Sequence, residues 1–444
     1  MKKIHIMNIK SACTMVLAVG LSAAVLAQVP IPAKPQSKPV MLIGGTVHTA
    51  TGKTIANAAV AFQNGKLTYV GTAEGAPADK SAFEVIDLKG QHIYPGFILT
   101  NTRLGLVEVE SIRATADFDE AGEYNPNVRS QPAYNTDSEH IAACRFNGIL
   151  LAEPTPTGGV ISGTSSVMQL EGWNWEDATH SKDAAVHLNW PGLQKTRFDF
   201  ETFSRINEPN ADYGKNLDEI GSFFDQAIAY GKLQSKEVNL KLKAMQGLFE
   251  GTQTLIIHAE RAKEMVDGVR LAQSKGVRRI ALAAGDEALA IVPFLNENNI
   301  PVILPSIHTL PGRPDEDIDL QYAQAAYLSK AGVKVVFSHT GSLGTARNLP
   351  FYAGTSVAHG MDGEAALQAL TINAARVLGI DGRVGTLEAG KDATLFVSKG
   401  DALDFRTSQL TSAYIGGRRI VLDNKHQELY QRYSDKYNHA LPKN

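Results

Sequence analysis

The stretch IYPGFILTNTRLGL, residues 93–106, decides how the fold and the function of this chain are interpreted. An apolar run broken by Pro95 and Gly96 leads to two polar side chains, Asn101 and Arg103. Alternate residues of a strand project from the same face, so both are predicted to lie together where a buried strand ends. A metal centre needs strong ligands such as histidine, whereas an amide is a weak ligand and a guanidinium repels a cation. The stretch therefore predicts a strand end whose side chains do not suit a metal.

The composition is that of a folded and mildly acidic protein. With 444 residues and 43% hydrophobic content, the chain can bury a large core, as one big domain with a small companion or as two ordinary domains. Its formal net charge is -3 at pH 7, and the sequence contains no block of basic residues. Nucleic acid is therefore not an expected partner.

Residues 1–27 have the three-part pattern of a secretory signal peptide. Lysines precede an apolar segment, and this segment ends in small residues before Gln28. A retained membrane anchor is the alternative, but the segment is short for a bilayer span. We expect a periplasmic or secreted protein without a transmembrane anchor after processing, in which the Pro-rich residues 28–39 form an extended tether. Cleavage leaves Cys144 as the one cysteine, so no intrachain disulfide is expected.

Two patterns divide the rest of the sequence. Short β-rich runs follow Val40, where Asn64-Gly65 predicts a tight hairpin turn, and β-rich runs return near the C-terminus. In the second half of the chain, short apolar runs alternate with helical stretches whose apolar residues are three or four apart. This alternation predicts a parallel sheet buried on both faces, either doubly wound or closed as a barrel. The β-rich chain ends are predicted to form one domain that flanks this α/β body.

Two motifs carry a family resemblance. Pro95-Gly96-Phe97-Ile98 and the run LTINAARVLGIDGRVGTLEAGKDATLFV, residues 370–397, resemble the amidohydrolase superfamily and, within it, the imidazolonepropionase-like branch. The resemblance implies an α/β fold with a TIM-like (β/α)8 barrel that carries one or two divalent metals at the C-terminal ends of its strands. It implies hydrolysis of carbon–nitrogen bonds, such as those of cyclic amides. It places the barrel at residues 95–384 and a composite β-sandwich domain at residues 40–94 and 385–444.

The resemblance also implies a set of metal ligands. Two histidines follow strand one, a lysine or carboxylate lies on strand four, single histidines end strands five and six, and an aspartate ends strand eight. In this sequence Asn101 and Arg103 stand at the positions of the first two histidines, while His258 keeps the histidine of strand five.

The other positions of this set also depart from the pattern. Ala284 stands at the position of the strand-six histidine, and Thr340 stands at the position of the aspartate. Glu153 and Glu171 are candidates for the strand-four ligand. Because the changes fall on three separate strands, the sequence predicts an amidohydrolase-like fold that has lost the metal centre.

Two interpretations of the remaining histidines stay open. His258, His308 and His339 each follow an apolar run, so all three are expected near the barrel mouth, where they would form a relocated zinc site with an open fourth position. Alternatively, they are ordinary polar residues hydrogen-bonded at strand ends, because no spacing rule connects them. Zinc or another divalent metal is expected only under the first interpretation.

The predicted ligand pocket has five members, and Arg103 is central among them. We expect the guanidinium to point into the pocket, where it either binds a carboxylate of a ligand or forms an ion pair with a protein acid such as Glu153. Residues 154–177 are rich in Gly, Ser and Thr and are expected to form a loop over the barrel mouth. The predicted pocket residues are Asn101, Arg103, Glu153, Glu260 and Thr340.

Two functions of different classes follow from these observations. The first is a hydrolase of carbon–nitrogen bonds with a reduced or displaced metal site. The second is a pseudoenzyme that binds a small molecule, or that pairs with a second copy of itself or with an intact amidohydrolase. Fold does not determine function without the site, so the sequence leaves open whether the chain is an enzyme.

Overall fold

The computed structural model describes residues 31–200, 203–233, 237–311 and 316–437. The predicted signal peptide at residues 1–27 lies outside this part of the chain, as do the first residues of the predicted tether. Within the described residues, no helix is both long enough and apolar enough to cross a membrane.

One of the two eight-stranded sheets forms a nearly closed barrel. A parallel bridge between Thr100 and Ser338 connects its first strand to its last. The barrel fold predicted from the family resemblance is therefore confirmed, and the doubly wound alternative is excluded. In sheet order the strands are β6 (Phe97–Thr102), β7 (Ile149–Pro154), β8 (Ile161–Gln169), β9 (Thr179–Asn189), β12 (Thr254–Ala259), β13 (Ile280–Ala284), β14 (Val302–Leu304) and β15 (Val335–Phe337).

One barrel strand runs against the others. β8 pairs antiparallel with both β7 and β9, whereas the remaining neighbouring strands of this sheet pair in parallel. The expectation that residues 154–177 form a loop over the mouth was wrong, because β8 lies inside this range and is almost wholly buried. Its small residues allow this burial, but they hid the strand in a sequence that otherwise predicts strands from Val, Ile and Leu.

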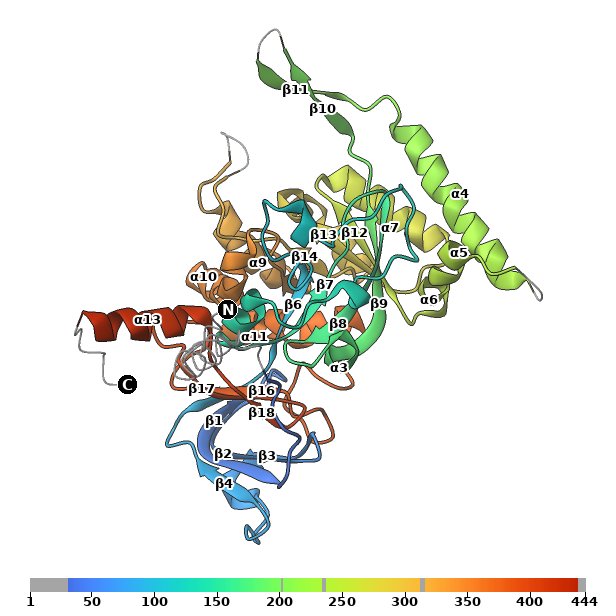
Figure 1. The fold of residues 1–444 in the computed structure, drawn as a ribbon. Helices are drawn as coiled ribbons and strands as arrows, with labels where there is room; N and C mark the ends of the chain where they lie inside the picture. The colour runs from blue at the N-terminus through green and yellow to red at the C-terminus, as the bar shows by residue number, and fades with distance from the viewer. Residues whose placement is uncertain (1–30, 201–202, 234–236, 312–315, 438–444) are drawn as a thin grey trace, which may run out of the picture. The chain divides into compact units, whose positions relative to one another are not determined.

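Helices cover the outside of the second half of the barrel (Figure 1). The apolar stripe predicted from residues three or four apart is confirmed in α7, where Met265, Val269 and Ala272 are buried. These helices are α7 (Ala262–Ser274), α8 (Val292–Glu297), α9 (Leu320–Lys330), α10 (Leu349–Ala358) and α11 (Gly363–Leu370), whereas α12 (Ile372–Leu378) lies at one end of the barrel.

A long excursion separates β9 from β12 and carries a hairpin and three helices (Figure 1). The hairpin strands β10 (Gln194–Asp199) and β11 (Ser204–Pro209) pair only with each other among the described residues. The helices α4 (Tyr213–Lys232), α5 (Leu240–Ala244) and α6 (Gln246–Glu250) then lead back to the barrel. The remaining helices are α2 (Glu139–Arg145), α3 (Trp175–Ala178) and α13 (Lys425–Lys436).

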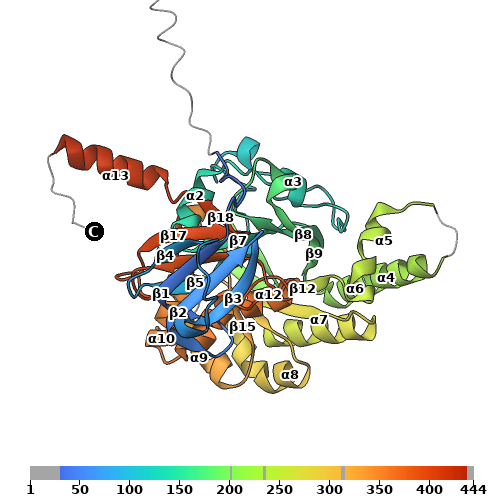
Figure 2. The same cartoon turned by 90° about the horizontal axis from the view of Figure 1, so that it is seen from below.

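Both chain ends contribute to the second sheet, as predicted. β16 pairs antiparallel with β5, and Figure 2 shows the N-terminal strands beside the C-terminal ones. The Asn64-Gly65 turn is also confirmed, because Gln63 pairs with Lys66 across it and both turn residues have positive φ. The strands are β1 (Val40–His48), β2 (Thr54–Gln63), β3 (Lys66–Thr72), β4 (Glu84–Asp87), β5 (His92–Pro95), β16 (Leu395–Ser398), β17 (Leu410–Ile415) and β18 (Arg418–Ile420).

The barrel interior has an apolar layer at one end, which α12 covers. Each strand contributes one side chain to this layer, and Ile372 and Ala375 of α12 pack against it. The layer fixes which residues point inward, because every second residue of a strand shares a face. Its members are Ile98, Leu151, Val167, Ala185, Ile256, Ala281, Ile303 and Val336.

Candidate functional site

The C-terminal ends of the barrel strands surround a cavity of about 920 Å³, which we call the mouth cavity. His258 and Ala259 line it at the end of β12, and Ala284 lines it at the end of β13. Gln194 and Asn207 reach it from the base of the β10–β11 hairpin. This is the position at which barrel enzymes bind their substrates, so the cavity is the candidate functional site.

A polar layer lies just above the apolar layer of the barrel. Glu153 lies two residues beyond Leu151 of the apolar layer, and His258 lies two beyond Ile256. The strand period of two therefore turns both inward. His187 lies two residues beyond Ala185 and also points inward. Ser165 belongs to the same polar layer although it lies two residues before Val167, because β8 runs in the opposite direction.

The end of β6 positions Glu153. Asn101 has a φ of 46°, a left-handed conformation that asparagine tolerates better than most residues. The pairing of β6 with β7 shifts between Leu99 and Thr102, so the strand is irregular at this point. The Asn101 backbone N–H donates to Glu153 Oε2 at 3.0 Å, and the Glu153 side chain is fully buried.

Three side chains connect Glu153 to the mouth cavity in one hydrogen-bonded chain. Ser165 Oγ donates to Glu153 Oε1 at 2.7 Å, and His187 Nε2 lies 2.8 Å from Ser165 Oγ. With the serine proton on the carboxylate side, His187 Nε2–H donates to the serine oxygen. His187 Nδ1 then accepts from His258 Nε2 at 3.0 Å. The carboxylate thus fixes the tautomer of both histidines, and His258 Nδ1 is left as the ring atom with a free lone pair.

Burial keeps His258 neutral. Removal from water lowers the pKa of its imidazole to about 3, and the neighbouring His187 lowers the pKa further. A ring with such a pKa is a poor base at neutral pH but a good hydrogen-bond acceptor. His258 can therefore receive a hydrogen bond from an N–H or O–H group of a ligand in the cavity.

His339 is held by a separate set of contacts. Its Nε2 lies 2.8 Å from Ser342 O and its Nδ1 lies 2.7 Å from Tyr352 Oη, so both ring nitrogens are hydrogen-bonded. Burial is the main cause that lowers the pKa of this imidazole, and the positive charge of Arg103 lowers the pKa as well. The neighbouring Thr340 lines the mouth cavity.

Arg103 does not fill the predicted role. It follows the end of β6, is partly exposed and is absent from the lining of the mouth cavity. Its guanidinium lies over the ring of Phe118, with 5.0 Å to the ring centroid, and its charge is stabilised by this ring and by water. No acid among the described residues lies within ion-pair distance, so the expected pair with Glu153 is not formed. Glu153 is also absent from the cavity lining, because it lies below Ser165 in the polar layer.

The mouth cavity is acidic. Its lining includes the carboxylates of Glu260, Glu264 and Glu287 and the guanidinium of Arg261. Arg261 Nη1 lies 3.3 Å from Glu287 Oε1. Glu264 is already hydrogen-bonded, because its Oε1 accepts from Leu193 N at 2.7 Å and its Oε2 accepts from two more backbone N–H groups. Glu260 is exposed, and its carboxylate has no hydrogen-bond partner among the described residues. The lining therefore favours neutral or cationic ligands that donate hydrogen bonds over anions.

The residues of the mouth do not fit the divalent metal that the resemblance implies. The strand ends carry an amide, an alanine and a threonine at Asn101, Ala284 and Thr340, and the retained His258 uses Nε2 to bond His187. In the ranges that the structure describes, no group of three or more His, Cys, Asp or Glu side chains is placed to hold a metal ion. The donor set therefore does not match the chemistry of a hydrolytic metal centre.

The three histidines of the predicted relocated zinc site do not meet. His258 lines the mouth cavity, whereas His308 lies at a different cavity and its Nε2 contacts Thr355 Oγ1 at 2.8 Å. His339 uses both nitrogens in the contacts described above. The geometry corresponds to the alternative interpretation, in which each histidine is hydrogen-bonded at its own strand end.

Sequence reasoning missed His187 and Ser165, and it misplaced strand four. Glu153 lies on the second strand of the barrel, and Glu171 follows the third strand and pairs with Arg145. The fourth strand is β9, whose inward polar residue is His187. The run AAVHLNW, residues 184–190, has the same form as the run that carries His258, an apolar stretch followed by an inward histidine. The predicted strand–helix alternation begins near residue 250, so β9 lies before the region in which it predicts strands.

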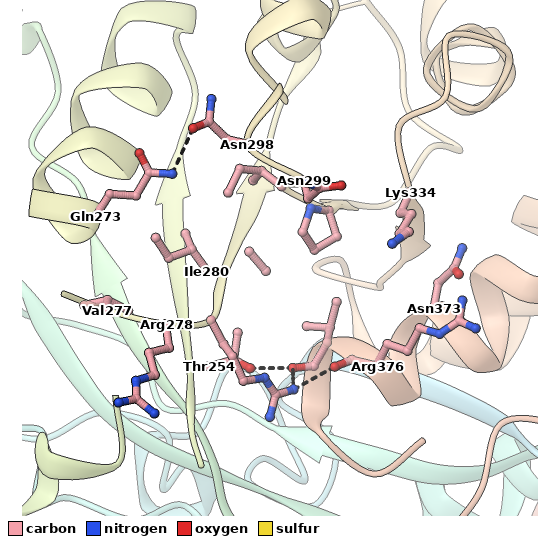
Figure 3. Close-up of a pocket in the computed structure, with 15 residues that line it drawn as sticks. Thr254, Gln273, Val277, Arg278, Ile280, Asn298, Asn299, Lys334, Asn373 and Arg376 are labelled. Carbon is pink, nitrogen blue, oxygen red and sulfur yellow. Dashed lines mark hydrogen bonds between the residues drawn. The ribbon is translucent and has the colours of Figure 1, made fainter. Parts of the chain in front are cut away.

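A second cavity, of about 320 Å³, lies at the opposite end of the barrel (Figure 3). Thr254 and Ile280 line it, and each begins a strand. Arg279 crosses its base and donates to the carbonyls of Arg376 and Val377 at 2.7 and 3.0 Å, which caps the C-terminus of α12. This arrangement stabilises the closed end of the barrel.

Comparisons with known proteins agree with this geometry. The sequence model of the amidohydrolase family matches residues 241–421. An amidohydrolase from Thermotoga maritima MSB8 is similar over 86% of this chain and 99% of its own, with 23% identity and a TM-score of 0.74. A putative prolidase from Bifidobacterium longum is similar over 91% of this chain and 100% of its own, with 17% identity and a TM-score of 0.52.

A Xaa-Pro dipeptidase with methionine bound in its active site is similar at 13% identity, over 86% of this chain and 99% of its own, with a TM-score of 0.52. Comparison with curated proteins finds no match. At these identities, the likeness to solved structures establishes the shared fold.

Proposed function

We infer that this chain, which matches the amidohydrolase family over residues 241–421 and has the amidohydrolase fold, binds a small molecule at its barrel mouth without the metal centre of the family. One observation supports this proposal most directly. The retained histidine of the metal set, His258, is joined through Nε2 to His187 instead of facing further ligands. The mouth has a cavity of ligand size, and it carries Asn101, Ala284 and Thr340 at positions where the resemblance implies metal ligands.

The lining suggests the class of ligand. His258 Nδ1 offers a hydrogen-bond acceptor, and Glu260 offers an exposed carboxylate at the same cavity. Both suit a neutral or cationic molecule with N–H groups, and similar folds belong to a prolidase and a Xaa-Pro dipeptidase. We propose an amide-bearing compound such as a short peptide or a cyclic amide, which is bound and is not hydrolysed by a metal-dependent reaction.

Two further proposals rest on the sequence. We place the chain in the imidazolonepropionase-like branch because of the motifs at residues 95–98 and 370–397. We propose export to the periplasm or the cell exterior because of the signal pattern at residues 1–27. Mass spectrometry of the mature N-terminus tests the second proposal, which expects a chain that starts near Gln28.

The ligand proposal is tested with methionyl-proline as the probe. Calorimetry measures binding, and product release is followed with and without added zinc or manganese. We expect binding without product. Thr340→Trp narrows the mouth and should weaken binding at least tenfold, whereas Thr252→Trp, an exposed threonine at the other end of the barrel, should leave it unchanged. Metal-stimulated release of proline would instead establish a hydrolase.

A further inference from the structure

A third cavity, of about 1030 Å³, lies between the second sheet and two helices that cover the barrel. We call this sheet, to which both chain ends contribute strands, the chain-end sheet. β1 and β5 form one wall through His48, His92 and Tyr94, and α10 and α11 form the opposite wall. No residue of the mouth cavity lines it. It is therefore a separate site, and its lining offers more apolar than polar surface, as small-molecule sites do. We call it the interdomain cavity.

Flat rings form the wall on the sheet side. The rings of His48 and Tyr94 are stacked, with centroids 4.3 Å apart and planes 2° apart. His92 stacks beside them, with its centroid 5.2 Å from that of His48, and its Nδ1 lies 2.9 Å from His48 Nε2. All three side chains project from one face of the sheet and line the cavity, where the Tyr94 ring is almost wholly buried against His48.

Two more aromatic rings stand on the helix side. Phe351 of α10 packs edge-on against Phe405, with centroids 6.3 Å apart. Phe405 is 73% exposed although it is a large apolar residue at the rim of a cavity. Such an exposed ring gains most from a ligand that covers it.

The charges in this cavity are mainly negative. Asp401 lines it beside His48 and Tyr94, and its Oδ1 accepts from Leu403 N at 2.9 Å. Within the described residues, the lining contains a single Lys or Arg, namely Arg406, and this residue pairs with Asp404 at 2.8 Å. Burial lowers the pKa of His48 to about 4, so this ring adds no positive charge at neutral pH. The Asp401 carboxylate thus faces an aromatic cavity without a cation to balance it.

We propose that the interdomain cavity binds a small organic cation with a flat apolar body. The ammonium group would lie against Asp401, because a carboxylate attracts a cation and donors on the cation can hydrogen-bond to it. The flat body would lie against Phe351 and Phe405. The proposal is independent of the ligand proposed for the mouth cavity.

Three indoles with one ring and different charges test the proposal by calorimetry on the purified full chain. They are tryptamine, which is a cation, tryptophol, which is neutral, and indole-3-acetate, which is an anion. We expect tryptamine to bind at least tenfold more tightly than tryptophol, and indole-3-acetate not to bind. Equal affinities for the three, or no binding of tryptamine, would overturn the proposal.

Two variants locate the site. Asp401→Asn keeps the acceptor for Leu403 N, so the local fold is preserved, and tryptamine affinity should fall to that of tryptophol. Phe405→Ala should weaken tryptamine and tryptophol alike. Phe200→Ala is the matched control, because Phe200 is 78% exposed on the distant hairpin, and it should change nothing. Unchanged tryptamine binding in Asp401→Asn or in Phe405→Ala would contradict the assigned site.

Discussion

At the scale of single residues, the barrel mouth contains a chain of hydrogen-bonded side chains that runs from a buried carboxylate to the cavity. Glu153 sets the direction of this chain, because its carboxylate can only accept, and Ser165, His187 and His258 follow in order. Each member is buried or largely buried, so the loss of one leaves a donor or an acceptor unsatisfied. The chain therefore both stabilises the barrel and determines which atom of His258 faces a ligand.

The double substitution Asn101→His with Arg103→His should not create metal-dependent hydrolysis. Strands six and eight would still end in Ala284 and Thr340, and position 101 would place a histidine in the left-handed conformation. Zinc titration and a hydrolase assay of the double variant measure the outcome, with the parent chain as control. One zinc per chain with turnover in this variant would refute our account of the strand ends.

Substitutions in the buried hydrogen-bonded chain should lower the free energy of unfolding by different amounts. His187→Ala removes the acceptor of His258 Nε2–H and leaves a cavity, which costs about 3 kcal/mol. Ser165→Ala should cost about 1 kcal/mol, because His187 Nε2 lies 3.3 Å from Glu153 Oε1 and can donate to it directly.

Urea denaturation measures these costs, and Ser222→Ala, an exposed serine on α4, serves as the control with a change below about 0.5 kcal/mol. A larger loss for Ser165→Ala than for His187→Ala would contradict the proposed order of the chain.

At the scale of elements, the barrel was predictable from the sequence where its strands are apolar and parallel. The runs around Ile256, Ala281, Ile303 and Val336 form strands as the pattern indicated. β8 was not predictable in the same way, because its Gly, Ser and Thr residues are typical of loops and are buried here only through the tertiary contacts of its neighbours. His187 was not predicted because the strand that carries it was not predicted. The mouth cavity is lined by Asn101, His258, Glu260 and Thr340, all four of which the sequence had placed near the barrel mouth.

The irregular strand β8 should depend on Gly163. Its φ is 150°, and an added Cβ would lie 2.6 Å from the Val128 carbonyl oxygen. Gly163→Ala should therefore lower the free energy of unfolding by about 2 kcal/mol or more, as other incompatible backbone positions do. Gly363→Ala is the control, since it starts a helix with open space around it, and it should be neutral or stabilising. Equal stability of both variants would show that β8 tolerates a different backbone.

At the scale of the whole molecule, buried histidines in both the barrel and the chain-end sheet make the stability of the fold depend on pH in the same direction. Burial lowers the pKa of His258 to about 3 and the pKa values of His48 and His180 to about 4. In the unfolded chain these rings titrate near 6.5. The unfolded state therefore binds more protons than the folded state between these values, and stability falls as the pH falls below about 6.5.

This linkage predicts that the free energy of unfolding decreases from pH 6.5 to pH 5.0, a window above the range in which most carboxylates titrate. His258→Gln should flatten the slope by up to about one proton, because it removes one buried imidazole and keeps a donor near His187. His140→Gln, which replaces a partly exposed histidine whose ring lies 3.2 Å from a backbone carbonyl, is the control. A stability that stays constant over this window would contradict neutral burial of these rings.

The central claim is that an amidohydrolase-like barrel has kept its mouth and lost its metal centre. The most direct measurement is the metal content of the purified chain after incubation with zinc or manganese and exhaustive dialysis, compared with His258→Ala. The strand ends at Asn101, Ala284 and Thr340 predict less than about one tenth of an equivalent in both proteins. One equivalent of metal in the parent chain that disappears in His258→Ala would contradict the account.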